Sequence, residues 1–163
     1  MEIVKSKDSF MNLSRELAQK AQNRESITKQ PKEKLSGLKT TLTIKNYLGG
    51  FYFFTCDEIK IDNNDIYLIE GKHSKHGVIP SLEDIKDGLM KMILFTNLKE
   101  VVLNGKKYCH KSVLKLTSEI GIKVGRLSDK DIDVLRTLNE ESNFNGFKVT
   151  INDEDLCEII KKL

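Results

Sequence analysis

Three charged residues, Asp57, Glu70 and Lys72, lie on either side of a short polar turn in the sequence. The turn is residues 62–65, and apolar and β-branched residues flank it on both sides, which predicts a β-hairpin. Counting outward from the turn puts Asp57 directly opposite Glu70, with Lys72 two residues further along the second strand. Opposed residues share one face of a sheet, and so do residues two apart on a strand. The three charges are therefore predicted to point the same way.

The same face is predicted to be apolar near the turn and charged farther along it. Charges beside apolar groups are costly to bury without partners, and two adjacent carboxylates repel each other. A divalent cation removes this conflict, and Mg²⁺ is typically held by one or two carboxylates together with a substrate phosphate. A metal held in this way activates water and stabilises charge on the phosphate, with Lys72 beside that water or that charge. The pattern indicates metal-assisted hydrolysis of a phosphate ester.

Two alternatives stay open from the sequence. If the register of the hairpin differs, Asp62 or Asp65 at the turn would supply the acid in place of Asp57. The three charges would otherwise form an ion-pair ladder on a solvated strand, which contributes little to stability. By alternation Glu58 faces the other side of the sheet and is not expected to join the site.

The rest of the chain predicts the elements that would position this hairpin. Strands are predicted from β-branched and alternating residues, and helices from apolar residues three and four apart behind a capping side chain. The expected strands are residues 40–47, 51–61, 66–72, 100–103 and 147–151. The expected helices are residues 9–22, 81–97 with Ser81 as cap, 111–120, one capped by Ser128 and a last one capped by Asn152. The order is α-β-β-β-α-β followed by a mostly helical C-terminal part, which indicates an α/β fold with a mixed sheet.

Asp57 and the run Glu70-Gly71-Lys72 together resemble the active site of the PD-(D/E)XK nucleases, the superfamily that includes most type II restriction endonucleases. In that family an Asp stands on one strand, a Glu-x-Lys follows on the next strand of the same hairpin, and an α-β unit comes after. Here the apolar run at residues 66–69 leads into the motif, and residues 81–97 supply the helix. Cys56 stands where the family often has Pro. The resemblance covers roughly residues 9–103.

The resemblance implies a restriction-endonuclease-like fold, with residues 1–163 as a single nuclease domain, a core at about 9–103 and a helical extension at about 104–163. Asp57 and Glu70 would be ligands of Mg²⁺ or Mn²⁺, the carbonyl of Gly71 a further ligand, and Lys72 the catalytic lysine. The implied activity is that of a DNA endonuclease, most like a type II restriction enzyme. It would act on double-stranded DNA as a homodimer, because one such site cuts one strand. Junction resolvases and repair nucleases share the motif, and the short chain fits either a compact enzyme or a catalytic fragment.

Basic residues after the motif mark the expected DNA contacts. His73 and Lys75 follow Lys72 closely, and residues 99–126 hold seven lysines and arginines against two acidic residues. Six of these residues form a basic cluster: Lys106, Lys107, Lys111, Lys115, Lys123 and Arg126. We expect them to bind DNA phosphates in a salt-dependent manner, although a solvated protein surface has the same composition. A non-catalytic DNA-binding or assembly module built on this cluster is the alternative function.

Composition limits the class of protein. A chain of 163 residues is typical of one domain, and 39% hydrophobic with 31% charged residues indicates a soluble globular protein. No apolar run approaches the roughly 18–20 residues of a membrane helix, so no membrane partner is expected. Three cysteines at unrelated spacings form neither a disulfide framework nor a zinc pair, and a cytoplasmic location is expected.

Overall fold

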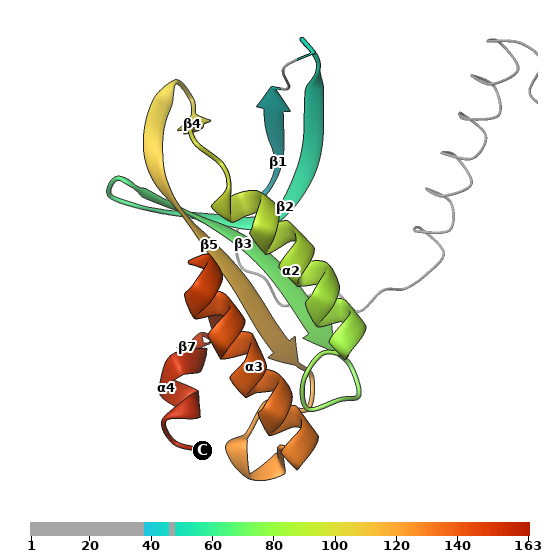
Figure 1. Ribbon diagram of the computed structural model, residues 1–163. Helices are drawn as coiled ribbons and strands as arrows, with labels where there is room; N and C mark the ends of the chain where they lie inside the picture. The colour runs from blue at the N-terminus through green and yellow to red at the C-terminus, as the bar shows by residue number, and fades with distance from the viewer. Residues whose placement is uncertain (1–37, 46–47) are drawn as a thin grey trace, which may run out of the picture. The chain divides into compact units, whose positions relative to one another are not determined.

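The computed structural model describes residues 38–45 and 48–163. Within these residues, seven strands and three α-helices build a mixed α/β fold (Figure 1). The strands are β1 (Leu38–Lys45), β2 (Phe51–Asp62), β3 (Asp65–Ser74), β4 (Val101–Leu103), β5 (Lys106–Ser118), β6 (Lys148–Ile151) and β7 (Glu154–Asp155). The helices are α2 (Leu82–Thr96), α3 (Asp129–Asn145), α4 (Leu156–Ile160) and the short 3₁₀ helix η1 (Val124–Arg126). The predicted helix at 9–22 lies outside the described residues.

The sheet combines antiparallel and parallel pairing. Its strand order is β1-β2-β3-β5-β6-β7, with β4 paired to β5 beside this path. The strands β1, β2 and β3 form an antiparallel meander, whereas β3 pairs in parallel with β5, and β5 in parallel with β6. Parallel neighbours need a crossover connection, and α2 and α3 supply these two crossovers. The predicted α/β class with a mixed sheet is confirmed.

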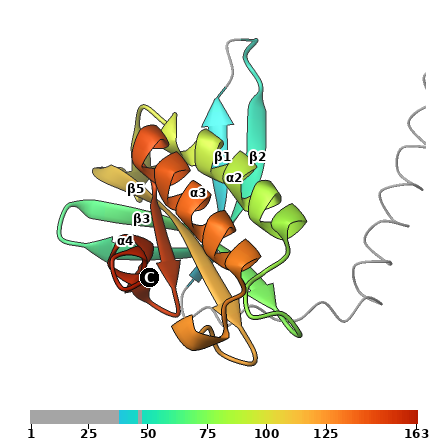
Figure 2. The ribbon, with the colours of Figure 1, turned by 60° about the horizontal axis from the view of Figure 1, so that its bottom comes forward.

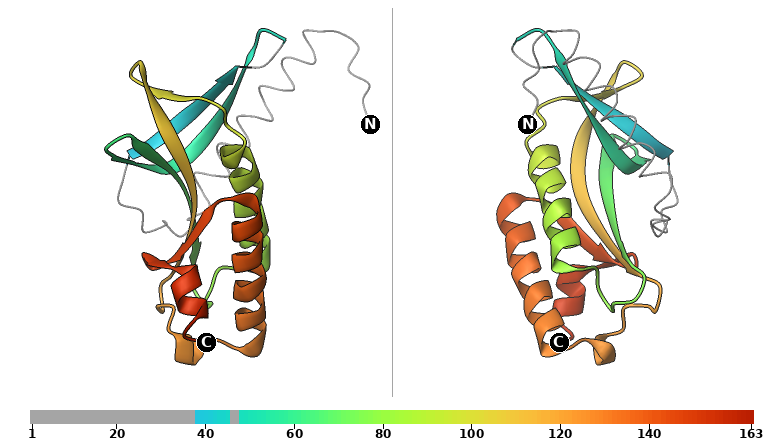
Figure 3. Two further views of the ribbon diagram at one scale, coloured as in Figure 1. Left: turned by 60° about the vertical axis from the view of Figure 1, so that its left-hand side comes forward. Right: turned by 90° about the vertical axis from the view of Figure 1, so that its right-hand side faces the viewer.

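Both crossover helices, α2 and α3, cover the same face of the sheet (Figures 1 and 3). The core lies between this face and the helices, where Leu68, Leu114 and Leu116 of the sheet pack with Met92 and Phe95 of α2. All five side chains are fully buried. The face that carries Leu68 also carries Glu70 and Lys72, because these residues are two apart on β3.

The hairpin of β2 and β3 has the predicted register. Asp62 pairs with Asp65, and the ladder continues to Glu58 opposite Ile69. Asn63 in the turn has a positive φ of 55°, a conformation that asparagine tolerates better than most residues. A two-residue turn fixes the register of the strands that it joins.

Two of the predicted helix caps are also confirmed. The Ser81 side chain accepts a hydrogen bond from the backbone N–H of Asp84 at the start of α2. Ser128 and Asp131 form a reciprocal capping box at the start of α3. These side chains satisfy backbone donors that the first helical turn leaves without partners, so they define where both crossover helices begin.

The C-terminal part differs from the prediction. Residues 111–120 were expected to form a helix, but β5 is the longest described strand and lies in the interior of the sheet (Figure 2). The run from Ser112 to Ser118 is buried residue after residue, as in a strand covered on both faces, and such a run lacks the alternation that distinguishes a strand. The helical extension from about 104 is therefore wrong for this segment. The last helix is capped by Asp155 rather than Asn152, because Asn152 and Asp153 form a turn between β6 and β7 with positive φ.

Candidate active site

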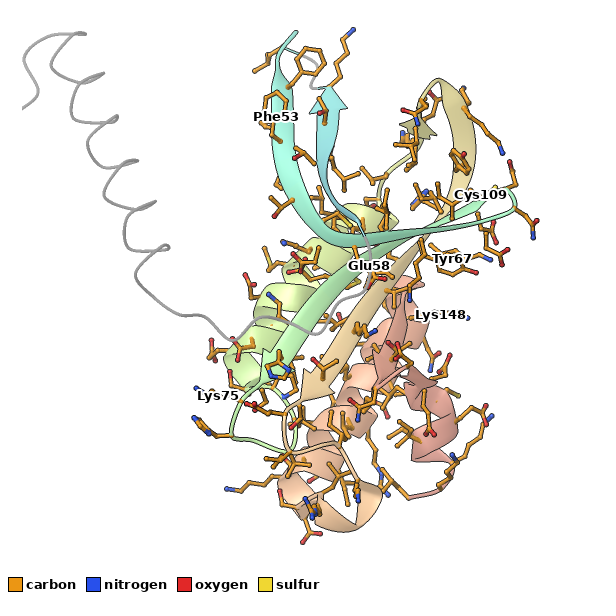
Figure 4. The ribbon with its side chains drawn as sticks, turned by 180° about the vertical axis from the view of Figure 1, so that it is seen from behind. Phe53, Glu58, Tyr67, Lys75, Cys109 and Lys148 are labelled. Atoms are coloured by element: carbon orange, nitrogen blue, oxygen red, sulfur yellow. The ribbon has the colours of Figure 1, made fainter. Side chains whose placement is uncertain are left out.

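The carboxylates Asp57 and Glu70 lie where the ladder between β2 and β3 ends. The paired positions stop at Glu58 and Ile69, and β2 bends away from β3 beyond this point (Figures 1 and 4). In place of a backbone acceptor, Oδ2 of Asp57 accepts the N–H of Gly71 at 3.1 Å. A side-chain carboxylate of β2 therefore replaces the ladder hydrogen bond that is missing at Gly71.

A β-bulge in β2 accompanies this opening. Leu38 of β1 pairs with Ile59 of β2, and Thr40 pairs with Cys56, so Asp57 and Glu58 together oppose one residue of β1. A bulge bends the strand that contains it and changes the direction of its side chains. Asp57 therefore owes its position to an irregularity between β1 and β2.

The carbonyl of Gly71 faces the same opening. In a strand the N–H and C=O of one residue point toward the same neighbouring strand. Because the N–H of Gly71 points at Asp57, its carbonyl oxygen is also directed toward β2. The next carbonyl, that of Lys72, instead accepts a hydrogen bond from the Thr117 hydroxyl of β5 at 3.4 Å.

Glu70 is the buried centre of the site, with 2% of its side chain exposed. Burial raises the pKa of its carboxyl group, and the neighbouring Asp57 raises it further, whereas the hydrogen bond from Lys91 lowers it. Each oxygen of this carboxylate has an ammonium beside it. Lys72 Nζ lies 3.1 Å from Oε1, and Lys91 Nζ lies 2.7 Å from Oε2.

Lys72 is held between two carboxylates. Its ammonium lies 3.1 Å from Glu70 Oε1 and 2.5 Å from Asp87 Oδ2 of α2. Burial lowers the pKa of Lys72, but the hydrogen bonds to Asp87 and Glu70 outweigh it, so the pKa is raised. The bond from Lys72 in turn lowers the pKa of Asp87. Lys72 is therefore protonated at neutral pH and fixed in place.

Asp87 and Lys91 were not found from the sequence. They are four residues apart on α2, so they share one side of the helix, next to the buried Gly88 and Met92. The sequence does show that the two residues are four apart, next to the apolar residues of the helix that follows the Glu-x-Lys strand. That signal is weak, because charged residues four apart are common on exposed helix faces.

The other acidic residues of the hairpin do not join the site. Asp62 is exposed at the turn and accepts a hydrogen bond from Asn63, and Asp65 forms an ion pair with Lys111. Glu58 lies on the face of the sheet opposite to α2, as predicted, with Tyr67 on the same side (Figure 4). It is fully buried, and Lys60 Nζ lies 3.4 Å from its Oε1. The register thus selects Asp57 as the partner of Glu70.

The residues expected to contact DNA lie in different settings. Lys107 forms an ion pair with Glu100 at 2.7 Å, and Lys106 lies over the Tyr108 ring. Lys111 pairs with Asp65, as described above. Lys115 is 6% exposed and its ammonium is paired with Asp153 at 2.7 Å. These lysines are spread along the 13 residues of β5 rather than gathered in one patch.

Two further basic residues lie at the end of β3, nearer the carboxylates in sequence. His73 Nδ1 is 3.0 Å from the Thr117 hydroxyl, and Lys75 is exposed in the loop after β3 (Figure 4). His73 follows Lys72 on β3, and Lys75 comes directly after the end of that strand. Of the residues expected to bind DNA, these two therefore lie nearest to the candidate site along the chain.

The set of donors fits a hard divalent cation. Asp57 and Glu70 offer carboxylate oxygens and Gly71 a carbonyl oxygen, which are the ligand types that Mg²⁺ takes in proteins. Among the described residues no group of three or more His, Cys, Asp or Glu side chains is arranged to hold a metal. A metal bound at this site would therefore need the backbone carbonyl, and water or a substrate phosphate, to complete its ligands.

Comparison with known proteins gives no relative: no protein-family model, curated protein or solved structure matches this chain. Among the described residues, no helix is long and apolar enough to cross a membrane. Function is therefore inferred from the geometry and chemistry of the site.

Proposed function

We propose that this chain is a divalent-metal-dependent deoxyribonuclease of the PD-(D/E)XK type, which hydrolyses phosphodiester bonds. One observation carries the proposal. Asp57 bonds the N–H of Gly71, next to Glu70, and raises the pKa of Glu70 where the ladder of β2 and β3 ends, and Lys72 lies 3.1 Å from Glu70. A solvated ion-pair ladder is the competing explanation, and the burial of Glu70 argues against it.

The order of the strands supports the same assignment. Asp57 and the Glu-x-Lys run occupy adjacent antiparallel strands, and α2 then crosses to β5, which pairs in parallel with β3. This order of elements supports the proposal, but the strand that follows α2 in the sheet is β5, whereas the strand expected there, at 100–103, is β4 and pairs with β5 beside the main path. The resemblance to a restriction-endonuclease-like fold remains part of the proposal.

The chain supplies distinct roles at the site. Asp57, Glu70 and the Gly71 carbonyl would hold Mg²⁺ or Mn²⁺. When bound, such a metal supplies a water of lowered pKa and neutralises charge on the phosphate. Lys72 holds its proton on Nζ and donates a hydrogen bond to the attacking water or to a phosphate oxygen as negative charge develops there. Asp87 keeps that ammonium in position.

The proposed substrate is double-stranded DNA. Lys75, in the loop directly after β3, would bind a phosphate next to the cut. The ring of His73 contacts Thr117 on the face of the sheet opposite to Lys72, so His73 would contact DNA only from that face. One site cuts one strand, so cleavage of both strands would need a homodimer. A type II restriction enzyme, a junction resolvase and a repair nuclease would use the same chemistry, and they differ in the DNA that they select.

The test is cleavage of supercoiled plasmid and phage DNA, with and without Mg²⁺, by the wild type and by Asp57→Asn, Glu70→Gln and Lys72→Met. We expect Mg²⁺-dependent cleavage that falls by about 10²-fold or more in each variant. Asp62→Asn is the matched control, because it changes an exposed aspartate of the same hairpin, and it should cleave like the wild type.

Equal cleavage by the wild type and Glu70→Gln would contradict the proposal, as would a wild type that binds DNA but cuts under no metal. Discrete fragments would indicate sequence-specific cleavage, and preference for four-way junctions would indicate a resolvase.

A further inference from the structure

Lys91 of α2 is a second lysine at the candidate metal site. Its Nζ lies 2.7 Å from Oε2 of Glu70, while Lys72 occupies the other oxygen. The side chain of Lys91 is 26% exposed, whereas that of Glu70 is 2% exposed. Lys91 therefore approaches the buried carboxylate from the solvent side.

The ion pair between Lys91 and Glu70 compensates a buried negative charge. An ionised carboxylate buried next to Asp57 is costly unless positive charge compensates it. A divalent metal bound by Asp57 and Glu70 would supply that compensation and would use the same carboxylate oxygens. Two cations that compete for one buried carboxylate repel each other, so occupancy by one weakens binding of the other.

The two lysines differ in what holds them. Lys72 is bonded to Asp87 as well as to Glu70, and its stem would lie 3.3 Å from a Cβ added at Gly88 on α2. Within the described part of the chain, Glu70 is the carboxylate that Lys91 contacts as an ion pair. If Glu70 binds a metal, Lys72 keeps its ion pair with Asp87, whereas Lys91 loses its ion pair with Glu70.

We propose that Lys91 is a resident cation that a divalent metal displaces from Glu70, and that the released ammonium then binds a phosphate of the DNA. This inference rests on the proposed function, because it needs a metal at Asp57 and Glu70. Lys91 thus neutralises the charge of Glu70 before the metal binds, and binds a DNA phosphate afterwards. It would bind the substrate phosphate, whereas Asp87 would act through Lys72.

The test is calorimetric titration of metal-free protein with Mn²⁺. We expect Lys91→Met to bind Mn²⁺ about tenfold more tightly than the wild type, since one competing positive charge is removed. Lys91→Arg keeps the charge and should stay near the wild-type affinity. Lys86→Met removes an exposed lysine of the same helix, paired with Glu83, and should leave Mn²⁺ binding unchanged.

DNA cleavage at saturating Mn²⁺ provides the second measurement. Lys91→Met should cleave at least about tenfold more slowly despite its tighter metal binding, because the phosphate contact is lost. Metal affinity and cleavage rate then move in opposite directions, which loss of folding would not produce. Cleavage by Lys91→Met at the wild-type rate would overturn the role at the phosphate.

The other outcomes separate this inference from the proposed function. If Lys91 only keeps Glu70 ionised, Lys91→Met will bind Mn²⁺ more weakly, and that result, like an unchanged affinity, overturns the displacement. If neither the wild type nor Lys91→Met binds Mn²⁺, the metal site fails and the proposed function fails with it. Mn²⁺ binding that disappears in Glu70→Gln would place the measured metal at the proposed ligands.

Discussion

Substitution of Gly88 by alanine tests how closely α2 approaches β3, the strand that carries Glu70 and Lys72. Gly88 is buried in the middle of α2, over the stem of Lys72 and the side chain of Leu114. A Cβ added there would meet Leu114 Cδ1 at 2.6 Å and Lys72 Cε at 3.3 Å. Carbon atoms in contact prefer about 3.5–4.0 Å, so the methyl group overlaps Leu114 by about 1 Å.

Two opposing effects set the size of the change. Alanine favours a helix interior over glycine by about 1 kcal/mol. Overpacking of a tight core costs about 1–3 kcal/mol, and Leu114 is fully buried, so it cannot move aside without its neighbours. We expect Gly88→Ala to lose about 1 kcal/mol of stability, which corresponds to a fall in Tm of about 2–4 °C for a chain of this size.

Urea unfolding followed by circular dichroism measures the stability, and plasmid cleavage measures the effect on Lys72. The cleavage rate should fall by more than the loss of folded protein explains, because the new methyl group pushes against the side-chain carbons of Lys72. Leu114→Val removes the clashing Cδ1 and should suppress the loss, with a coupling of about 0.5–3 kcal/mol in the double-mutant cycle. If Gly88→Ala is about 1 kcal/mol more stable than the wild type and cleaves at the same rate, α2 does not approach Lys72 and Leu114 as closely as described.

The remaining predictions concern the anchors of the site and its supporting helices. Asp87→Asn removes the carboxylate that holds Lys72 and should slow cleavage while Mn²⁺ affinity stays close to the wild type. Because its pKa is lowered in the folded state, Asp87 stabilises the protein above the ordinary aspartate pKa and loses this effect as pH falls through the lowered value. Urea midpoints should therefore separate wild type from Asp87→Asn at pH 7 and converge in strong acid. Ser128→Ala breaks the capping box of α3 and should cost about 1 kcal/mol with cleavage unchanged. Phe95→Ala empties a fully buried position of α2 and should cost about 3–5 kcal/mol, measured by urea unfolding.

The hairpin could be predicted from sequence because its determinants are local. The turn fixes which residues of β2 and β3 face each other, and alternation then places Glu70 and Lys72 on one face. The pattern of the hairpin does not predict that its ladder ends at Glu58. That end depends on the bulge against β1, which involves a third strand.

The strand β5 and the residues of α2 depend on longer-range packing. Val113 to Leu116 are buried on both faces of the sheet, and the alternation that would have identified a strand is absent there. The sequence shows the helical spacing of Asp87 and Lys91, but it does not show which side of α2 faces β3. That rotation follows from packing at Gly88, where the helix lies against Lys72 and Leu114.

The charged side chains of the site come from one continuous segment, from Asp57 to Lys91, whereas Leu114 beside Glu70 comes from the later strand β5. Hairpins form within microseconds, and pairing between distant parts of a chain forms later. We therefore expect the carboxylates to meet while they are still hydrated and to lose their water later, when β5 pairs with β3. We expect the charges of Asp57 and Glu70 to slow this late step, so Glu70→Gln should refold faster than the wild type.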